Sequence, residues 1–448
     1  MRRWDVRRSH NAAVATLVVL AMVAGACSGS GSEPPSASKL ETNFDVTPQA
    51  NAVILDESLV EDLLVSSDPD AGEYRFRGSK DDIGSPEIGQ AVALGGAGFG
   101  IVSSVLEEGG ETVLQLSEAT LGDIVDTGTL EWDYDVSWAD FEFTFEETAG
   151  LSGPVFAAMA PVVAQTSQKT TIEFTHQGWK FTIELEPKDE RLNFKLVGSL
   201  SIGTSPAQAS ISGQGWVSGF NYSSTLEYEG GSPVDMTTDI NGLQGEIELK
   251  WAAFRTPQQA ITEIVKFNAP LSLPIPIPGP YGIPMALQLK VAGRIVPELS
   301  ALESSSGGSW KVKYSSDQGF KVESDGVGLP QGVLKSDAID TSGDTVTAGL
   351  GPAGFGLGVE FPRFELGFVG YSPFAFITID TYSTSLWTPG TTLTADIPPC
   401  QYGYTKFSAI AGYQLKVLGW ASLTDQYTLW EKQVDKYLDG KECTLSGD

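Results

Sequence analysis

Histidine and cysteine are scarce in this chain, with two His and three Cys among 448 residues. His10 lies in a basic and apolar N-terminal segment, which leaves His176 as the one imidazole further along the chain. A zinc site built from His and Cys needs about four such ligands, and a Ser-His-Asp triad would depend on His176, which lies in an expected turn. The nearest match to a nucleophile elbow, residues 203–207 (GTSPA), places a Pro where a helix should start. The composition therefore argues against zinc and serine-hydrolase chemistry.

Basic side chains are also few, with 28 Lys and Arg against 57 Asp and Glu and a formal net charge of −29. Without residues 1–26, which hold four Arg and one Asp, 24 basic and 56 acidic side chains remain, a net charge of −32. Such a surface repels nucleic acid and anionic headgroups, so a nucleic-acid partner is excluded. Solubility outside the cell explains this acidity more simply than an acidic binding site does.

The N-terminus has the layout of a secretory signal. Four arginines (Arg2, Arg3, Arg7 and Arg8) precede an apolar run over residues 12–26 that ends in small side chains. The run is shorter than the roughly 20 residues that a permanent membrane-spanning helix needs. We therefore expect residues 1–26 to be a cleaved signal peptide.

The end of this run, Val23-Ala24-Gly25-Ala26-Cys27, resembles the lipobox of bacterial lipoproteins. The resemblance implies a lipid on Cys27 and cleavage directly before it, although Ala24 stands where the family usually has Leu. Residues 28–38 (SGSGSEPPSAS) are too polar to fold, and residues 27–39 are therefore expected to be the lipidated Cys and a flexible tether. The predicted location is the outer face of a bacterial membrane in the cell envelope, with the lipid as anchor. An ordinary cleavable signal with an incidental Cys is the alternative.

If Cys27 carries the lipid, Cys400 and Cys443 remain as an even pair in an oxidising compartment. A disulfide between them would stabilise the fold by roughly 3–4 kcal/mol in the chain-entropy model.

Alternation of apolar and polar residues dominates the rest of the chain. It is clear at Trp179, Phe181, Ile183 and Leu185, and again around residues 192–196, 247–251 and 310–314. A two-residue period with one polar face predicts antiparallel sheet, and 50 Gly and 25 Pro supply turns. The predicted fold is mainly β, with a small β module over residues 40–138 and a large antiparallel β domain over residues 139–448.

Few helices are expected. Thr256-Pro257 has the features of a helix start, with Ile261, Ile264 and Val265 as its apolar stripe. A C-terminal helix is predicted over residues 424–439, because apolar side chains recur there at helical spacing before Gly440. A shorter helix is expected from Ser117.

Two apolar segments depart from the alternating pattern, residues 151–164 and the Pro-rich residues 271–284. The simpler interpretation is that both are loops buried over the sheet. The alternative is that they line an apolar cavity or enter a membrane, with Val155, Phe156, Ile275, Ile277 and Tyr281 as the candidate ligand-lining residues.

Asp68, Asp70 and Glu73 have the alternating spacing of carboxylates that wraps Ca²⁺, but the distal Glu of a full loop is missing. A solvated acidic turn explains the same residues, so the sequence supports no cofactor beyond this weak Ca²⁺ candidate.

The sequence thus favours a lipid-anchored extracytoplasmic surface protein with a non-catalytic binding or envelope-structural role. One alternative is a carrier of a lipid or other apolar ligand. Another is a protein that binds or cleaves cell-wall glycans, because 10 Trp and many carboxylates would suit that task.

Overall fold

The computed structural model describes residues 39–69, 71–138, 169–188, 190–201, 208–255, 263–269, 273–299, 303–324, 328–335, 340–350, 353–368, 371–389, 399–420 and 424–437. All of them belong to one compact unit. No helix within these ranges is both long enough and apolar enough to span a membrane. The predicted lipidation site, Cys27, lies outside the described residues.

The hairpin at His176 shows how the alternating sequence becomes sheet. Strands β9 (Thr170–His176) and β10 (Trp179–Lys188) pair antiparallel, with His176 opposite Trp179. The alternate residues Trp179, Phe181, Ile183 and Leu185 are all at most 2% exposed, while the residues between them face outward. One face of the hairpin is therefore core, as the two-residue period predicts.

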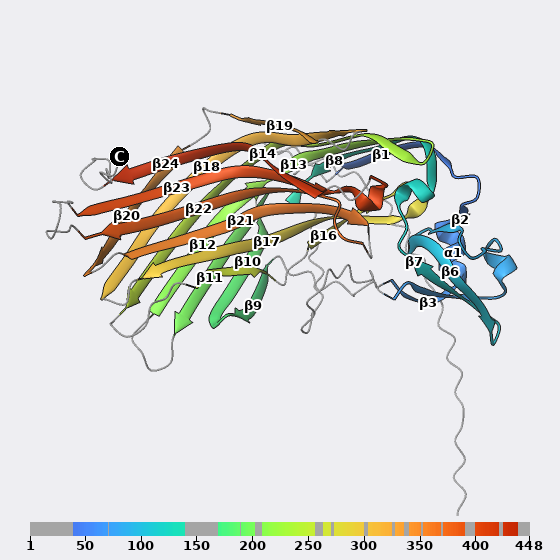
Figure 1. Ribbon diagram of the computed structural model, residues 1–448, viewed down its shortest axis with the longest axis horizontal. Coiled ribbons are helices and arrows are strands. Elements are labelled where there is room, and N and C mark those ends of the chain that lie inside the picture. Colours follow the sequence, from blue (N-terminus) through green and yellow to red (C-terminus); the bar gives the residue numbers. More distant parts are fainter. Residues whose placement is uncertain are drawn as a thin grey trace, which may run out of the picture. The chain divides into compact units, whose positions relative to one another are not determined.

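The first large sheet contains 11 described strands (Figure 1). All its pairings are antiparallel. Besides β9 and β10 its strands are β1 (Lys39–Pro48), β8 (Val125–Val136), β11 (Arg191–Ser201), β12 (Gln208–Ser218), β13 (Phe220–Glu229), β14 (Ser232–Arg255), β18 (Ser304–Glu323), β19 (Gly328–Leu334) and β20 (Asp340–Gly349).

Strand β14 organises this sheet because it is long enough to serve two sets of neighbours. β18 pairs with it from Asp235 to Arg255, while β13 and β12 pair with successive halves of its other edge. The halves meet at Gly242, where φ is +73° and the register with β18 shifts. Glycine enters this left-handed region without the steric cost that a Cβ imposes, so it allows a bulge in mid-strand.

The second large sheet has seven described strands, again all antiparallel. They are β15 (Val265–Asn268), β16 (Leu273–Pro278), β17 (Pro284–Leu299), β21 (Ala353–Phe368), β22 (Ala375–Thr388), β23 (Cys400–Gln414) and β24 (Thr424–Tyr437). The strands from β21 to β24 follow one another as neighbours in chain order, which is the simplest connection for antiparallel strands.

The predicted C-terminal helix is wrong, because its residues form β24. A bulge opposite Ala409 and Ile410 inserts an extra residue, Leu429, into this strand. Tyr427 and Trp430 therefore point to the same face although they are three residues apart, which imitates helical spacing. The helix predicted from Thr256 is also not seen where the structure describes it: Val265 begins β15, and residues 256–262 lie outside the described ranges.

The two large sheets pack face to face around one hydrophobic core. Aromatic rings from the facing sheets meet at distances typical of stacked or tilted pairs. The inter-sheet ring pairs with the shortest centroid distances are Phe194–Phe361 at 4.4 Å, Phe181–Phe267 at 4.4 Å and Phe220–Phe364 at 4.5 Å. Side chains, rather than open space, fill this part of the interior.

Small hydroxyl side chains join the sheets where β18 and β20 face β22. The Ser306 hydroxyl is 3.0 Å from the Thr347 hydroxyl, which also hydrogen-bonds Ser385 across the interface. All three residues are buried. Buried hydroxyls need such partners, because an unpaired buried polar group costs about 1–3 kcal/mol.

The small sheet has six described strands and lies within the predicted N-terminal module. Its helix α1 (Glu57–Leu63) starts where Asp56 accepts the Leu59 N–H at 2.8 Å. Ser117 ends β7, and the short helix expected from there is a three-residue 3₁₀ turn, Leu121–Asp123. The strands are β2 (Val53–Leu55), β3 (Leu64–Asp68), β4 (Glu73–Arg77), β5 (Ala91–Leu94), β6 (Gly98–Glu108) and β7 (Glu111–Ser117).

The small sheet ends short of the predicted module boundaries at residues 40 and 138. Strands β1 and β8, which flank it in sequence, pair with each other and β8 pairs with β13 in the first large sheet. Residues 53–117 thus form an insertion between two neighbouring strands of the large sheet. Phe99 of this insertion stacks on Tyr371 at 4.6 Å, next to the second large sheet.

Candidate functional site

The weak Ca²⁺ candidate gains no support from the described carboxylates. Asp68 accepts the Ala71 N–H at 3.0 Å, and Glu73 accepts the Arg75 Nε–H at 2.8 Å. Asp70 lies outside the described residues. Within the described ranges, no group of three or more His, Cys, Asp or Glu side chains is placed to hold a metal ion. This geometry favours the acidic turn over a cation site.

Of the five candidate ligand-lining residues, three lie in or against the hydrophobic core and two lie outside the described residues. Ile275 and Ile277 are 1% and 2% exposed on β16, where they join the core shared by the large sheets. Tyr281 is half-buried in a turn with φ of +55° and packs on that core. Val155 and Phe156 lie outside the described residues. The described part of the Pro-rich segment is therefore not a loop over the sheet: it begins with β16, a strand that pairs with β17 and turns Ile275 and Ile277 into the core.

Cys400 is the first residue of β23. Cys443, its predicted partner, lies outside the described residues, so the disulfide stays a prediction. His176 ends β9 instead of lying within the turn.

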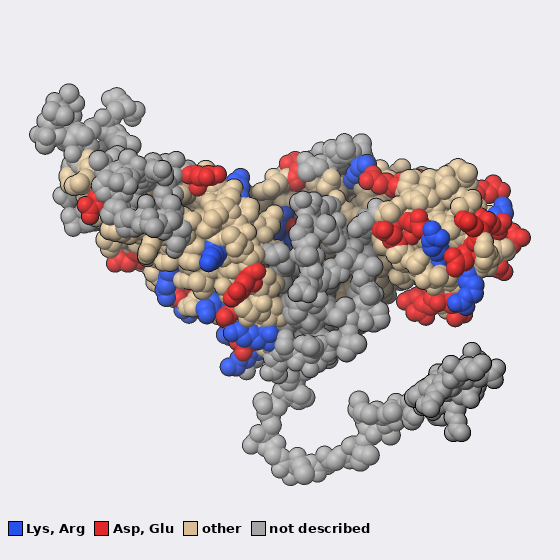
Figure 2. All heavy atoms as spheres, turned by 90° about the horizontal axis from the view of Figure 1, so that it is seen from below, with Lys and Arg blue, Asp and Glu red and all other residues tan. Residues whose placement is uncertain are grey.

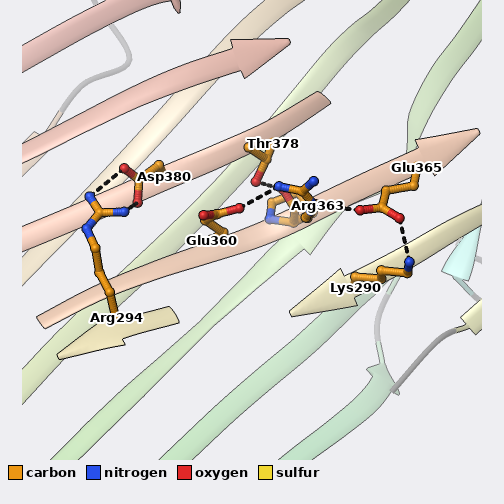
Figure 3. A network of polar contacts seen from close by, with 8 residues as sticks. Lys290, Arg294, Glu360, Arg363, Glu365, Thr378 and Asp380 are labelled. Carbon is orange, nitrogen blue, oxygen red and sulfur yellow. Dashed lines mark hydrogen bonds and ion pairs between the residues drawn. The ribbon is translucent and has the colours of Figure 1, made fainter. Parts of the chain in front are cut away.

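Charged residues gather on the outer face of the second large sheet (Figure 3). Along β21, apolar side chains face the core, and Glu360, Arg363 and Glu365 point the other way. The antiparallel register brings Lys290 of β17 opposite Arg363. On the other side of β21, Asp380 of β22 lies opposite Glu360.

These charges form two groups of ion pairs, one that joins Lys290, Glu365, Arg363 and Glu360 and one that joins Arg294 to Asp380. Lys290 Nζ is 2.5 Å from Glu365 Oε2, and Arg363 Nε is 2.7 Å from Glu365 Oε1. Arg363 also reaches Glu360, with Nη1 2.8 Å from Oε2. Arg294 of β17 holds Asp380 with two hydrogen bonds, at 3.1 and 2.7 Å. We call these six residues the ion-pair network; they comprise three cations and three carboxylates.

Two buried carboxylates of this network have pKa values shifted in opposite directions. Burial alone would raise the pKa of Glu365, but Lys290 and Arg363 outweigh it, and the pKa lies below its ordinary value. Burial raises the pKa of Asp380 above its ordinary value, because Arg294 only partly offsets it and Glu360 adds repulsion. The difference follows from two cations beside Glu365 and one beside Asp380.

Four tyrosines continue this face beyond the ion-pair network. Tyr382 of β22, Tyr404 and Tyr402 of β23 and Tyr437 of β24 form a row whose successive ring centroids are 6.0, 5.5 and 4.9 Å apart. All four are half-buried. Arg294 lies over the Tyr382 ring at 4.9 Å and so connects the network to this tyrosine cluster.

The tyrosine cluster is held in place by its neighbours. A Cβ on Gly356 would lie only 2.1 Å from the Tyr382 hydroxyl, so the tyrosine side chain packs directly against this glycine. The Tyr402 hydroxyl donates to Asp435 Oδ1 at 2.6 Å and accepts from Gln433 Nε2 at 3.3 Å. Burial raises the pKa of Tyr382 and Tyr404, which keeps both phenols protonated.

No family model, curated protein or solved structure matches this chain. The site must therefore be interpreted from its own chemistry. Each carboxylate of the ion-pair network is bound to a cation. The half-buried tyrosines beside it offer a rigid surface of rings and hydroxyls.

Neither feature was among the residues expected from the sequence. The charged residues come from β17 and from the consecutive strands β21 and β22, and the register of these strands makes them neighbours. One local signal is present: charges interrupt an apolar, Gly-rich strand at Glu360, Arg363 and Glu365. A charge at alternate positions of such a strand indicates an outward face that needs partners.

Proposed function

We propose that this chain is a lipid-anchored extracytoplasmic protein that binds a glycan without cleaving it, through the tyrosine cluster on the second large sheet. The row of half-buried rings beside a charge-balanced network is the observation that carries this proposal. Sugar rings present apolar C–H faces that stack on aromatic side chains, and their hydroxyls bond to carboxylates and amides such as Asp435 and Gln433.

The state of the carboxylates supports binding over catalysis. Glycoside cleavage needs two carboxyl groups, one acting as acid and the other as nucleophile or base. Asp380 is bound by Arg294 through two hydrogen bonds, and Glu365 by Lys290 and Arg363. These contacts hold both carboxylates at fixed positions, which suits a structural or binding role, while burial still raises the pKa of Asp380.

Packing between the large sheets argues against the carrier alternative for the described residues. A carrier needs an apolar cavity for its ligand. Here the rings of Phe194 and Phe361, and those of Phe220 and Phe364, meet between the two sheets. At these positions side chains, and not open space, lie between the two sheets.

The glycan proposal is tested by replacing Tyr404 with Ala. We expect retention of the protein on insoluble polysaccharide, extracted from the envelope of the producing organism, to weaken by about tenfold, the effect typical of a central aromatic contact. Trp216→Ala is the matched control, because it removes an aromatic side chain, stacked on Arg191, from the first large sheet. Equal retention of the wild type and Tyr404→Ala would contradict the proposal.

The anchor is tested separately by Cys27→Ala. This variant should move from the membrane to the soluble envelope fraction or the medium, because it has lost the residue that carries the lipid. Ser28→Ala, one position further on, should stay with the membrane. Continued membrane association of the Cys27→Ala protein would show that the lipobox assignment is wrong.

A further inference from the structure

An open cavity of about 510 Å³ lies on the first large sheet, near one end of β14. Its volume falls within the range of small-molecule sites. It is separate from the tyrosine cluster, which belongs to the second large sheet. The residues that line it are Ser199, Leu200, Gln208, Ala209, Ser210, Ala252, Ala253, Phe254, Ser305, Ser306, Gly307 and Val346.

The strand register makes this cavity a groove that crosses the strands. Ser199 lies opposite Ser210, Ser210 opposite Ala252, Ala252 opposite Gly307, and Gly307 opposite Val346. Small side chains therefore line up across β11, β12, β14 and β18. With Val346 of β20 included, the groove crosses five neighbouring strands. The four spacings between these strands give the groove a length of ~19 Å at the usual distance between strands. We call this feature the transverse groove.

Gly307 contributes to the groove by lacking a side chain. Glycine weakens the interior of a strand, so a structural reason for it is expected. A Cβ on Gly307 would lie 3.6 Å from its nearest neighbour, the carbonyl oxygen of Trp251, which is ordinary contact. Its φ is also outside the left-handed region. The backbone accepts a side chain here, so what glycine provides is open space above the sheet.

Polar side chains in the groove have unused hydrogen-bonding capacity. The hydroxyls of Ser199, Ser210 and Ser305 and the amide of Gln208 are exposed and make no side-chain hydrogen bond among the described residues. On the adjacent part of the same face, polar and charged side chains bond to one another. There, Glu248 accepts from Gln214 at 2.6 Å and pairs with Lys250 at 2.8 Å.

Charge in the groove also differs from the rest of the surface. Figure 2 shows Asp and Glu beside Lys and Arg over the described surface in that view. None of the residues that line the cavity is ionisable, in a chain with a net charge of −29. Phe254 and Val346, at 45% and 67% exposed, provide apolar contact at its margin. A ligand that fits should be uncharged and should have both apolar faces and hydroxyl groups.

We propose that the transverse groove is a second binding site, which takes an uncharged glycan chain lying across the strands. The free hydroxyls and the Gln208 amide would bond to sugar hydroxyls, and the Phe254 ring would stack on a sugar face. A fatty acyl chain would cover the same polar groups without pairing them, at a cost in free energy. The proposal is independent of the tyrosine cluster, which lies on the other large sheet.

The test uses the full mature chain and isothermal titration with maltohexaose, cellohexaose, xylohexaose and mannohexaose, which are uncharged and longer than a single sugar. Gly307→Thr and Ala252→Trp fill the floor of the groove from outward-facing positions. We expect at least one sugar to bind the wild type and each variant to weaken that binding by about tenfold or more. Their melting temperatures should stay near that of the wild type, and Gly307→Thr should equal or exceed it.

Two control variants establish whether the sugar binds in the groove. Ser223→Thr changes a half-buried outward residue of β13 on the same sheet, away from the groove, and should leave binding unchanged. Tyr404→Ala tells the two sites apart: binding lost in Gly307→Thr and kept in Tyr404→Ala locates the sugar in the groove, whereas binding lost only in Tyr404→Ala locates it at the tyrosine cluster and overturns the groove proposal. The proposal is overturned if no sugar binds, if Gly307→Thr binds as well as the wild type, or if the groove binds the fluorescent fatty acid parinaric acid in place of sugars.

Discussion

Replacing Glu365 with Gln should destabilise the protein more than the loss of any exposed ion pair. Glu365 is 7% exposed, and its two oxygens lie 2.5 Å from Lys290 Nζ and 2.7 Å from Arg363 Nε. At an effective dielectric constant of ~20, each contact attracts by roughly 6–7 kcal/mol. Removing the carboxylate from water costs several kcal/mol in return. The side chains of Lys290 and Arg363 remain 34% and 24% exposed, which screens the attraction. We therefore expect a net loss of about 2–4 kcal/mol at neutral pH.

The pH dependence of this effect has a defined sign. The pKa of Glu365 is lowered in the folded protein, so its contribution to stability is complete above the ordinary unfolded value of about 4.3. That contribution is lost as the pH falls through the folded pKa. The Gln variant has no carboxyl group to protonate. The stability gap between the two proteins should be constant near neutral pH and should close below about pH 4.

Urea unfolding monitored by tryptophan fluorescence at several pH values measures this gap. Glu118→Gln is the matched control, because Glu118 pairs with Lys416 at 2.8 Å while its side chain is 79% exposed. That variant should unfold with the wild type. The reasoning fails if Glu365→Gln also unfolds with the wild type at pH 7, or if its gap persists unchanged in acid.

Three further changes test the packing of the large sheets by the same unfolding measurement. Phe364→Ala should cost about 3–5 kcal/mol, because it empties a buried site 4.5 Å from the Phe220 ring; a cost below about 1 kcal/mol would mean that the sheets do not pack here. Ser385→Ala should cost about 1–2 kcal/mol, because the buried Thr347 hydroxyl loses one of its partners; unchanged stability would argue against the hydroxyl contact. Gly242→Val should destabilise by at least about 1–2 kcal/mol, because φ of +73° is strained for a branched residue; a neutral result would contradict the bulge in β14.

Local alternation was sufficient to predict single hairpins. Trp179 to Leu185 forms a buried face because a two-residue period determines which side of a strand is apolar, whatever its neighbours are. The same reasoning failed at β24, where one inserted residue places Tyr427 and Trp430 on a common face at helical spacing. A bulge depends on the partner strand, so residues 424–437 alone do not reveal it.

The candidate sites could not be predicted in the same way. The ion-pair network joins Lys290, Glu365 and Asp380, and the groove joins Ser199, Ser210, Ala252 and Gly307. Each set is assembled by the pairing of strands that are separated in sequence. A shift of one residue in register would turn these side chains to the opposite face.

It follows from the sequence alone that the chain is mainly β and which residues of many strands are buried. These properties follow from composition and from a period that each strand carries alone. Only the tertiary structure decided that β1 and β8 join the large sheet, that charges from β17, β21 and β22 neutralise one another, and that small residues of four strands form a groove. These features depend on which strands become neighbours and in what register, and those are non-local choices that the packing of the whole core makes.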